Sequence, residues 1–75
     1  MAILTLKSIK KIRGYDYDIE VEIKRLFRKP VTRVYRGNCT VFHDLHTGEM
    51  AGYGIREILM EWVWLEQQRG RTHGP

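Results

Sequence analysis

Three side chains that can bind a metal or take part in nucleophilic catalysis lie close together in the sequence: Cys39, His43 and His46. Alternating residue types from residue 39 to residue 45 predict a strand. On such a strand Cys39 and His43 share a face but lie about 13 Å apart. A zinc ion needs ligand atoms at about 2 Å, and a nucleophile needs its base within hydrogen-bond reach. The spacing therefore argues against both a zinc site and a Cys–His catalytic pair.

No other motif in the chain indicates catalysis. The sequence contains no Walker loop, no G-x-G-x-x-G and no H-E-x-x-H, and its glycines do not have phosphate-loop spacing. A chain of 75 residues also leaves little room for a deep cleft of its own. We therefore expect a protein that is not an enzyme, with no catalytic residues, metal, cofactor or small-molecule substrate.

Carboxylates alternate with large apolar residues from Tyr15 to Ile23. A period of two predicts a strand with every acid on one face and every apolar side chain on the other. The acids are Asp16, Asp18, Glu20 and Glu22. Their spacing of about 6.8 Å resembles a row of phosphates, but it cannot converge on one calcium ion. Cross-strand pairing with the lysines of residues 7–11 or with Arg33 is favoured over a nucleic-acid mimic.

A basic segment without acids follows, from residue 24 to residue 36. Folded as a hairpin, it gathers cations at one end of a sheet, where they suit a phosphate backbone. Phe27 and Tyr35 could stack on bases if they are exposed. A solvated hairpin and an acidic protein partner remain as alternatives. The candidate nucleic-acid or nucleoprotein site comprises Lys24, Arg25, Arg28, Lys29, Arg33 and Arg36, helped by Lys7, Lys10 and Lys11.

Hydrophobic periodicity predicts the elements that position these residues. The expected strands span residues 3–12, 15–27, 31–35 and 39–45, with turns at 36–38 and 46–49 and a short fifth strand at 50–52. Residues 3–12 carry apolar groups on both faces and also fit a short helix, but their β-branched content favours a strand. From residue 53 or 54 to residue 68 the spacing is helical. The order predicts an α+β fold, with a small antiparallel sheet of four to five strands packed against one C-terminal α-helix.

The predicted helix is apolar on two sides. At about 100° per residue its core stripe comprises Leu65, Ile58, Trp62 and Leu59, with Ile55 as the origin. Met60 and Trp64 fall near 140° and 180°, with Arg56 and Gln67 beside Met60. A second apolar face predicts a protein interface or a homodimer. The alternative is that the sheet or a tyrosine covers Trp64.

Composition sets the class of molecule. The chain has 75 residues, 43% of them hydrophobic and 29% charged, with a net charge of +4, as expected for one small basic domain. It shows neither a membrane-length apolar run nor a signal-peptide pattern, and its single cysteine suits a reducing compartment, so we expect a cytoplasmic protein. Residues 70–75 are expected to form a flexible tail.

These observations favour binding over catalysis. No stretch of the chain matches a family motif. In style only, as a tiny basic domain without a catalytic signature, it resembles accessory proteins of phages and plasmids, which include DNA-binding regulators and inhibitors of host defence complexes. We expect it to bind nucleic acid or a nucleic-acid-handling complex through the basic hairpin. The alternatives are an inhibitor or adaptor that docks on a protein through Met60 and Trp64, and a homodimer formed through the same face.

Overall fold

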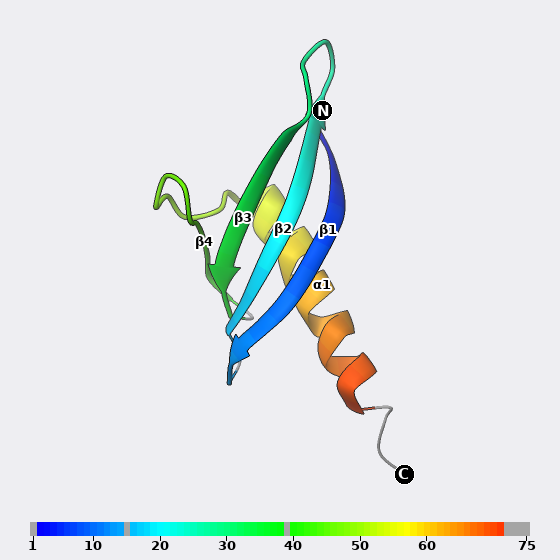
Figure 1. Ribbon diagram of the computed structural model, residues 1–75, viewed down its shortest axis with the longest axis vertical. Helices are drawn as coiled ribbons and strands as arrows, with labels where there is room; N and C mark the ends of the chain where they lie inside the picture. Colours follow the sequence, from blue (N-terminus) through cyan, green and yellow to red (C-terminus); the bar gives the residue numbers. More distant parts are fainter. Residues whose placement is uncertain (1, 15, 39, 72–75) are drawn as a thin grey trace.

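The computed structural model describes residues 2–14, 16–38 and 40–71. Its strands are β1 (Ala2–Arg13), β2 (Asp16–Arg25), β3 (Val31–Gly37) and β4 (Phe42–Asp44), and its helix is α1 (Tyr53–Arg71). The strands form one antiparallel sheet in the order β1-β2-β3-β4, and α1 crosses one face of it (Figure 1). This confirms the predicted α+β fold.

Strand β2 supplies half of the core. Ile19 and Val21 are completely buried under α1, and Tyr17 and Ile23 are nearly so. Each buried aliphatic side chain contributes about 1.5–3 kcal/mol relative to exposure. The alternating acids lie on the opposite, uncovered face, as the period of two predicts. Tyr15, the first residue of the pattern, lies outside the described residues.

Strand β1 is a bulged strand, which resolves its ambiguous pattern. Leu6 pairs with Val21 but Ser8 pairs with Glu20, so Lys7 is an extra residue on β1. A one-residue bulge reverses the faces of all residues that follow it. Leu4, Leu6 and Ile9 therefore lie on the helix side of the sheet, although their spacing breaks strict alternation. A second irregularity lies between Lys11 and Arg13.

Several predicted boundaries are wrong. Strand β2 ends at Arg25, before Leu26 and Phe27, and β3 continues through Arg36 and Gly37, which were predicted to turn. The β3–β4 turn comes after Gly37. It is held by Asn38, whose side-chain oxygen accepts hydrogen bonds from the backbone N–H groups of Thr40 and Val41, at 2.9 and 3.3 Å. Gly37 is needed beside this turn, because a Cβ there would overlap the carbonyl oxygen of Val41.

Strand β4 is shorter than predicted. It contains only Phe42–Asp44, and the expected fifth strand is reduced to a single bridge between Met50 and His43. Phe42 is completely buried and Asp44 is nearly so, whereas His43 lies on the open face. Cys39 lies outside the described residues, so its predicted distance from His43 stays a prediction.

Helix α1 presents a different face to the sheet than the one predicted. Leu59 and Val63 are completely buried, whereas Leu65 is 47% exposed, so its predicted place in the core is wrong. The helix crosses the sheet diagonally, and its C-terminal turns extend beyond the sheet on the β1 side (Figure 1). The helix also includes residues 70 and 71, where the tail was expected to begin. Residues 72–75 lie outside the described residues.

Candidate nucleic-acid interface

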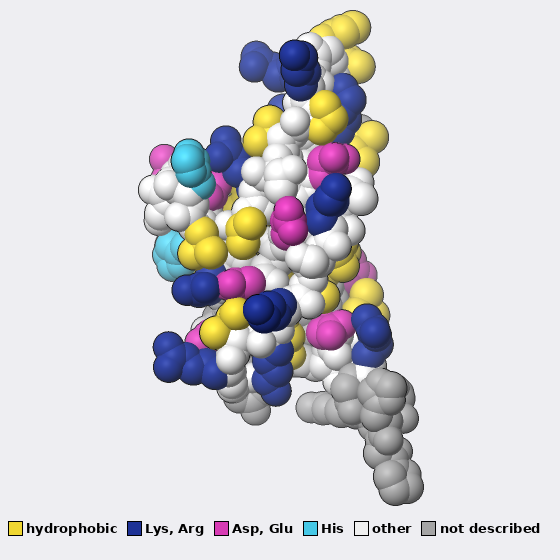
Figure 2. Space-filling model, in the orientation of Figure 1, with side chains coloured by type: hydrophobic (Ala, Val, Ile, Leu, Met, Phe, Trp, Pro, Cys, Tyr) yellow, Lys and Arg dark blue, Asp and Glu magenta, His cyan; other side chains and the backbone are white. Residues whose placement is uncertain are grey.

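The loop between β2 and β3 projects from the end of the sheet that lies farthest from the C-terminus of α1 (Figure 1). We call the last two residues of β2 and the first four residues of this loop the fingertip. The fingertip comprises Lys24, Arg25, Leu26, Phe27, Arg28 and Lys29. All six are exposed, and the apolar Leu26 and Phe27 are 74% and 94% exposed. Basic and hydrophobic side chains gather together at this end of the surface (Figure 2).

A strained four-residue turn holds Phe27 at the apex. The N–H of Arg28 donates to the carbonyl oxygen of Arg25 at 3.1 Å, which closes the turn. Phe27, the third residue of the turn, has a φ of 63°, a value that glycine or asparagine usually supplies. The Lys24 ammonium donates to the carbonyl oxygens of Arg28 and Arg25, at 2.6 and 3.3 Å. Lys24 therefore braces the loop, and the other three cations, Arg25, Arg28 and Lys29, are exposed within two residues of Phe27 in the chain.

An apolar hollow lies beside this turn. Ile3 on β1 pairs with Lys24 on β2, and these two residues line the hollow together with Arg25 and Leu26. Its volume is about 400 Å³. Ile3 is 64% exposed, so the hollow, lined by two apolar and two basic residues, is open to solvent. Sequence reasoning missed Ile3 and Leu26, because their exposure depends on where β2 ends.

Arg33 and Arg36 do not join the fingertip. In the β2–β3 register Arg33 stands opposite Val21, on the helix side, where its guanidinium lies 3.9 Å from the carboxylate of Asp44. Arg36 stands opposite Asp18 on the uncovered face. Its Nε and Nη2 donate to the two Asp18 carboxylate oxygens at 2.7 and 2.9 Å. The predicted pairing of Arg33 with the acids of β2 is therefore wrong, because Arg33 lies on the helix side of the sheet. Arg36 is the arginine that pairs with Asp18 on the uncovered face.

The pair of Asp18 and Arg36 is a bidentate ion pair. Its charged hydrogen bonds hold the pKa of Asp18 below its usual value and raise the pKa of Arg36. Lys10 stands opposite Asp18 from the β1 side and favours the ionised carboxylate further. Ser8 donates to Glu20 at 3.4 Å on the same face. Of the four acids on this face, Asp18 is thus paired with an arginine, and Glu20 accepts a hydrogen bond from a neutral hydroxyl.

The three lysines of β1 lie away from the fingertip. Lys7 occupies the bulge, and Lys10 and Lys11 stand opposite Asp18 and Tyr17. At about 3.4 Å per residue, these positions lie roughly 14–27 Å along the sheet from Arg25. The predicted basic set therefore divides into a fingertip, two paired arginines and a lysine row on the β1 edge.

Three of the four residues predicted to form a protein interface on α1 lie together, and Arg56 lies elsewhere. Trp64 is 57% exposed, whereas Met60 and Trp62 pack partly against the core. A hollow of about 330 Å³ on this side is lined by Met60, Glu61, Val63, Trp64 and Gln67. Arg56 does not line it. Its guanidinium lies over the ring of Tyr53, 5.4 Å from the ring centre.

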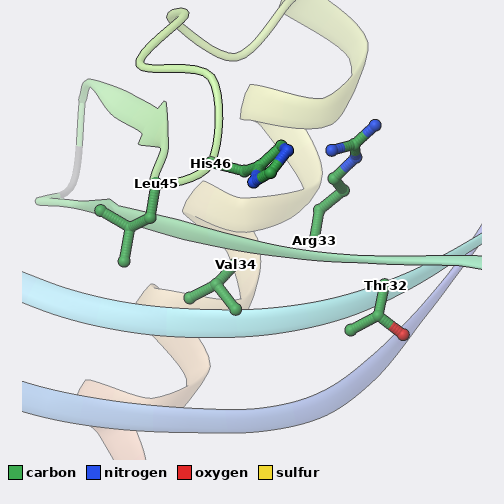
Figure 3. A pocket seen from close by; sticks show the side chains of 5 residues that line it. All are labelled: Thr32, Arg33, Val34, Leu45 and His46. Atoms are coloured by element: carbon green, nitrogen blue, oxygen red, sulfur yellow. The ribbon is translucent and has the colours of Figure 1, made fainter.

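A third hollow, of about 510 Å³, opens between β3 and the turn after β4. Arg33 and His46 lie on the helix side of the β3 ribbon, and Thr32, Val34 and Leu45 point the other way (Figure 3). The buried Asp44 beside it accepts the N–H groups of His46 and Thr47, at 2.7 and 3.3 Å. Asp44 thereby shapes this turn as an Asx turn. The signal that sequence reasoning missed is an aspartate directly before a turn.

Neither a metal-binding cluster nor a membrane-spanning helix was found within the part of the chain that the structure describes. Its His, Cys, Asp and Glu residues form no group of three that could hold a metal ion. No helix of these residues is long and apolar enough to cross a membrane. Comparison of the chain with protein-family models, curated proteins and solved structures found no match.

Proposed function

We propose that the protein is a non-catalytic binding protein that engages nucleic acid through the fingertip. The observation that carries the proposal is the largely exposed Phe27 in a turn whose neighbouring residues are exposed cations and include no acid. Ion pairs with carboxylates engage Arg33, Arg36 and Arg69 elsewhere in the fold, whereas Arg25, Arg28 and Lys29 are exposed at the fingertip. Phosphate groups suit such a cluster because each neutralised phosphate releases counterions. We place this function in the cytoplasm, where a single cysteine stays reduced.

Salt dependence measures how many cations take part. Arg25, Arg28 and Lys29 are available for phosphate, since Lys24 is engaged by the loop carbonyls. Three contacts predict a slope of log affinity against log salt of about −2.1 to −2.7. Between 50 and 200 mM salt the affinity should fall by roughly 20- to 40-fold.

The test compares two charge reversals of equal size. Arg28→Glu with Lys29→Glu alters the fingertip, and Lys10→Glu with Lys11→Glu alters the β1 edge by the same net charge. Fluorescence anisotropy with labelled DNA and RNA at low salt should show loss of binding for the first variant and modest weakening for the second. An equal loss of binding in both variants would show that the interaction depends on net charge alone and would contradict a specific role for the fingertip. No binding of the unaltered protein to any nucleic acid would remove the proposal.

We propose docking on a protein as the second candidate function, in the manner of an inhibitor or adaptor. The supporting observation is the exposed Trp64 beside the hollow lined by Met60 and Gln67. Tryptophan is enriched at residues that dominate binding energy. Trp64→Ala should abolish association with the target or with a second copy. Tyr53→Ala, at another exposed aromatic of α1, should leave association intact, as pull-down and sedimentation would show.

A further inference from the structure

We propose that the fingertip takes unpaired nucleotides, with one base stacked on the Phe27 ring and the adjacent phosphates held by Arg25, Arg28 and Lys29. This inference rests on the proposed nucleic-acid binding and narrows it to single strands. Three observations support it: the strain at Phe27, the chemistry around the ring, and the small size of the fingertip.

The backbone at Phe27 is unfavourable for phenylalanine. A left-handed conformation costs a residue with a Cβ free energy that glycine does not pay, and asparagine tolerates it better. The ring is 94% exposed, so packing within the chain does not offset this cost. Residues in such conformations concentrate at ligand-binding sites. The exposed ring is therefore positioned for a contact outside the chain.

The surroundings of the ring specify a ligand with a flat face and negative charge. In the open hollow next to the turn, Ile3 and Leu26 offer apolar contact, and Lys24 and Arg25 line it as well. Every nucleobase has a π face that stacks on an aromatic ring, and its phosphate lies one backbone unit away. A nucleotide satisfies the apolar and the cationic part of the site together.

The size of the fingertip favours an unpaired strand over a duplex. Even a single duplex-binding module buries about 600–1,000 Å² of protein surface. Inserting a ring between paired bases also costs a few kcal/mol of unstacking, which extensive contacts must offset. The fingertip is only six consecutive residues around one four-residue turn, and both paired arginines lie elsewhere on β3. Unpaired bases need no unstacking from a partner strand, so this small site can bind them.

The experiment measures fluorescence anisotropy with three labelled probes: a single-stranded oligonucleotide, its duplex, and an abasic strand of equal length. The unaltered protein should bind the single strand about 10-fold more tightly than the other two, the range expected for one stacked base. Phe27→Asn, which suits a positive φ, should weaken single-strand binding about 10-fold and leave abasic binding unchanged. Phe27→Tyr keeps the ring and should restore single-strand binding. Thermal melts verify that both variants fold.

The outcomes separate this inference from the proposed function. Nucleic-acid binding that ignores Phe27→Asn, or prefers the duplex, overturns the single-strand inference and leaves the proposed function standing. Absence of binding to all three probes overturns both. The protein could instead bind vesicles of phosphatidylcholine and phosphatidylserine, lose that binding in Phe27→Asn, and bind none of the probes. This result would assign the fingertip to an anionic membrane surface and overturn both proposals.

Discussion

Two regions of the same hairpin carry exposed and buried apolar residues within a few positions of each other. Val21 on β2 is completely buried beneath α1, whereas Leu26 and Phe27, just beyond the strand, are largely exposed. Both regions are apolar, yet the helix covers only the first (Figure 1). Apolar residues that α1 covers therefore stabilise the fold, whereas apolar residues that it leaves exposed are available to a partner. Substitutions in the two regions should therefore have opposite consequences for stability and binding.

The largest effect is expected in the covered region. Val21→Asp should unfold the domain, because an unpaired carboxylate would enter a core that excludes water. Glu20→Lys, one residue away on the uncovered face, should cost less than about 1 kcal/mol. Far-ultraviolet circular dichroism and urea unfolding measure both variants. Equal damage from the two substitutions would contradict the assignment of faces.

The second effect tests the face of α1 that packs on the sheet. Leu59→Ala should destabilise the protein by about 2–5 kcal/mol, since it removes a completely buried side chain. Trp64→Ala should change stability by less than about 0.5 kcal/mol, because more than half of that side chain is exposed. Trp62→Ala should fall between them, as its side chain is only partly buried. A large loss for Trp64→Ala would show that Trp64 belongs to the core.

The third effect concerns the ion pair on the uncovered face. Arg36 lowers the pKa of Asp18 in the folded protein, so the pair stabilises the fold above the unfolded value near 3.8. The contribution is lost as the pH falls through the lower folded pKa. Both side chains are partly exposed, so solvent screens their attraction and the gain in stability at pH 7 is small. Urea unfolding of Asp18→Asn should show a deficit at pH 7 that disappears near pH 2.

The smallest effect is expected at the fingertip, with the opposite sign. Phe27→Gly should raise stability by about 0.5 kcal/mol, because glycine relieves the left-handed backbone, and the greater entropy that glycine gives the unfolded chain offsets only part of this gain. A small increase in melting temperature combined with weaker nucleic-acid binding would separate the two regions most clearly. A loss above 1 kcal/mol would mean that the ring packs against the chain.

The fold class could be predicted from the sequence because its strongest signals are local. Strict alternation on β2 and the change to helical spacing at residue 53 each require only a few neighbouring side chains. The faces of β1 could not be predicted, because a bulge at Lys7 changes the phase of the pattern and depends on pairing with β2. Which face of α1 packs on the sheet likewise depends on the diagonal crossing of the helix, and a helical wheel drawn from the sequence gives no information about that crossing.

The candidate site was predicted in part for a similar reason. The basic loop follows from charge alone, and Lys24, Arg25, Arg28 and Lys29 lie together as expected. Arg33 and Arg36 lie elsewhere because the register assigns them to opposite faces, each with its own carboxylate. The apex position of Phe27 depends on a turn that its residue type disfavours, so propensity predicts strand there.

The long edge of β1 has a consequence for molecules that meet at high concentration. A free strand edge can template pairing with a second chain, which leads to aggregation or fibres. Along β1 the bulge at Lys7 and the irregularity after Lys11 interrupt the backbone pattern that a second strand would need. Lys7, Lys10 and Lys11 add charge repulsion between two such edges. The lysine row that lies far from the fingertip thus opposes edge-to-edge polymerisation, and removing its charges should lower the concentration at which the protein aggregates.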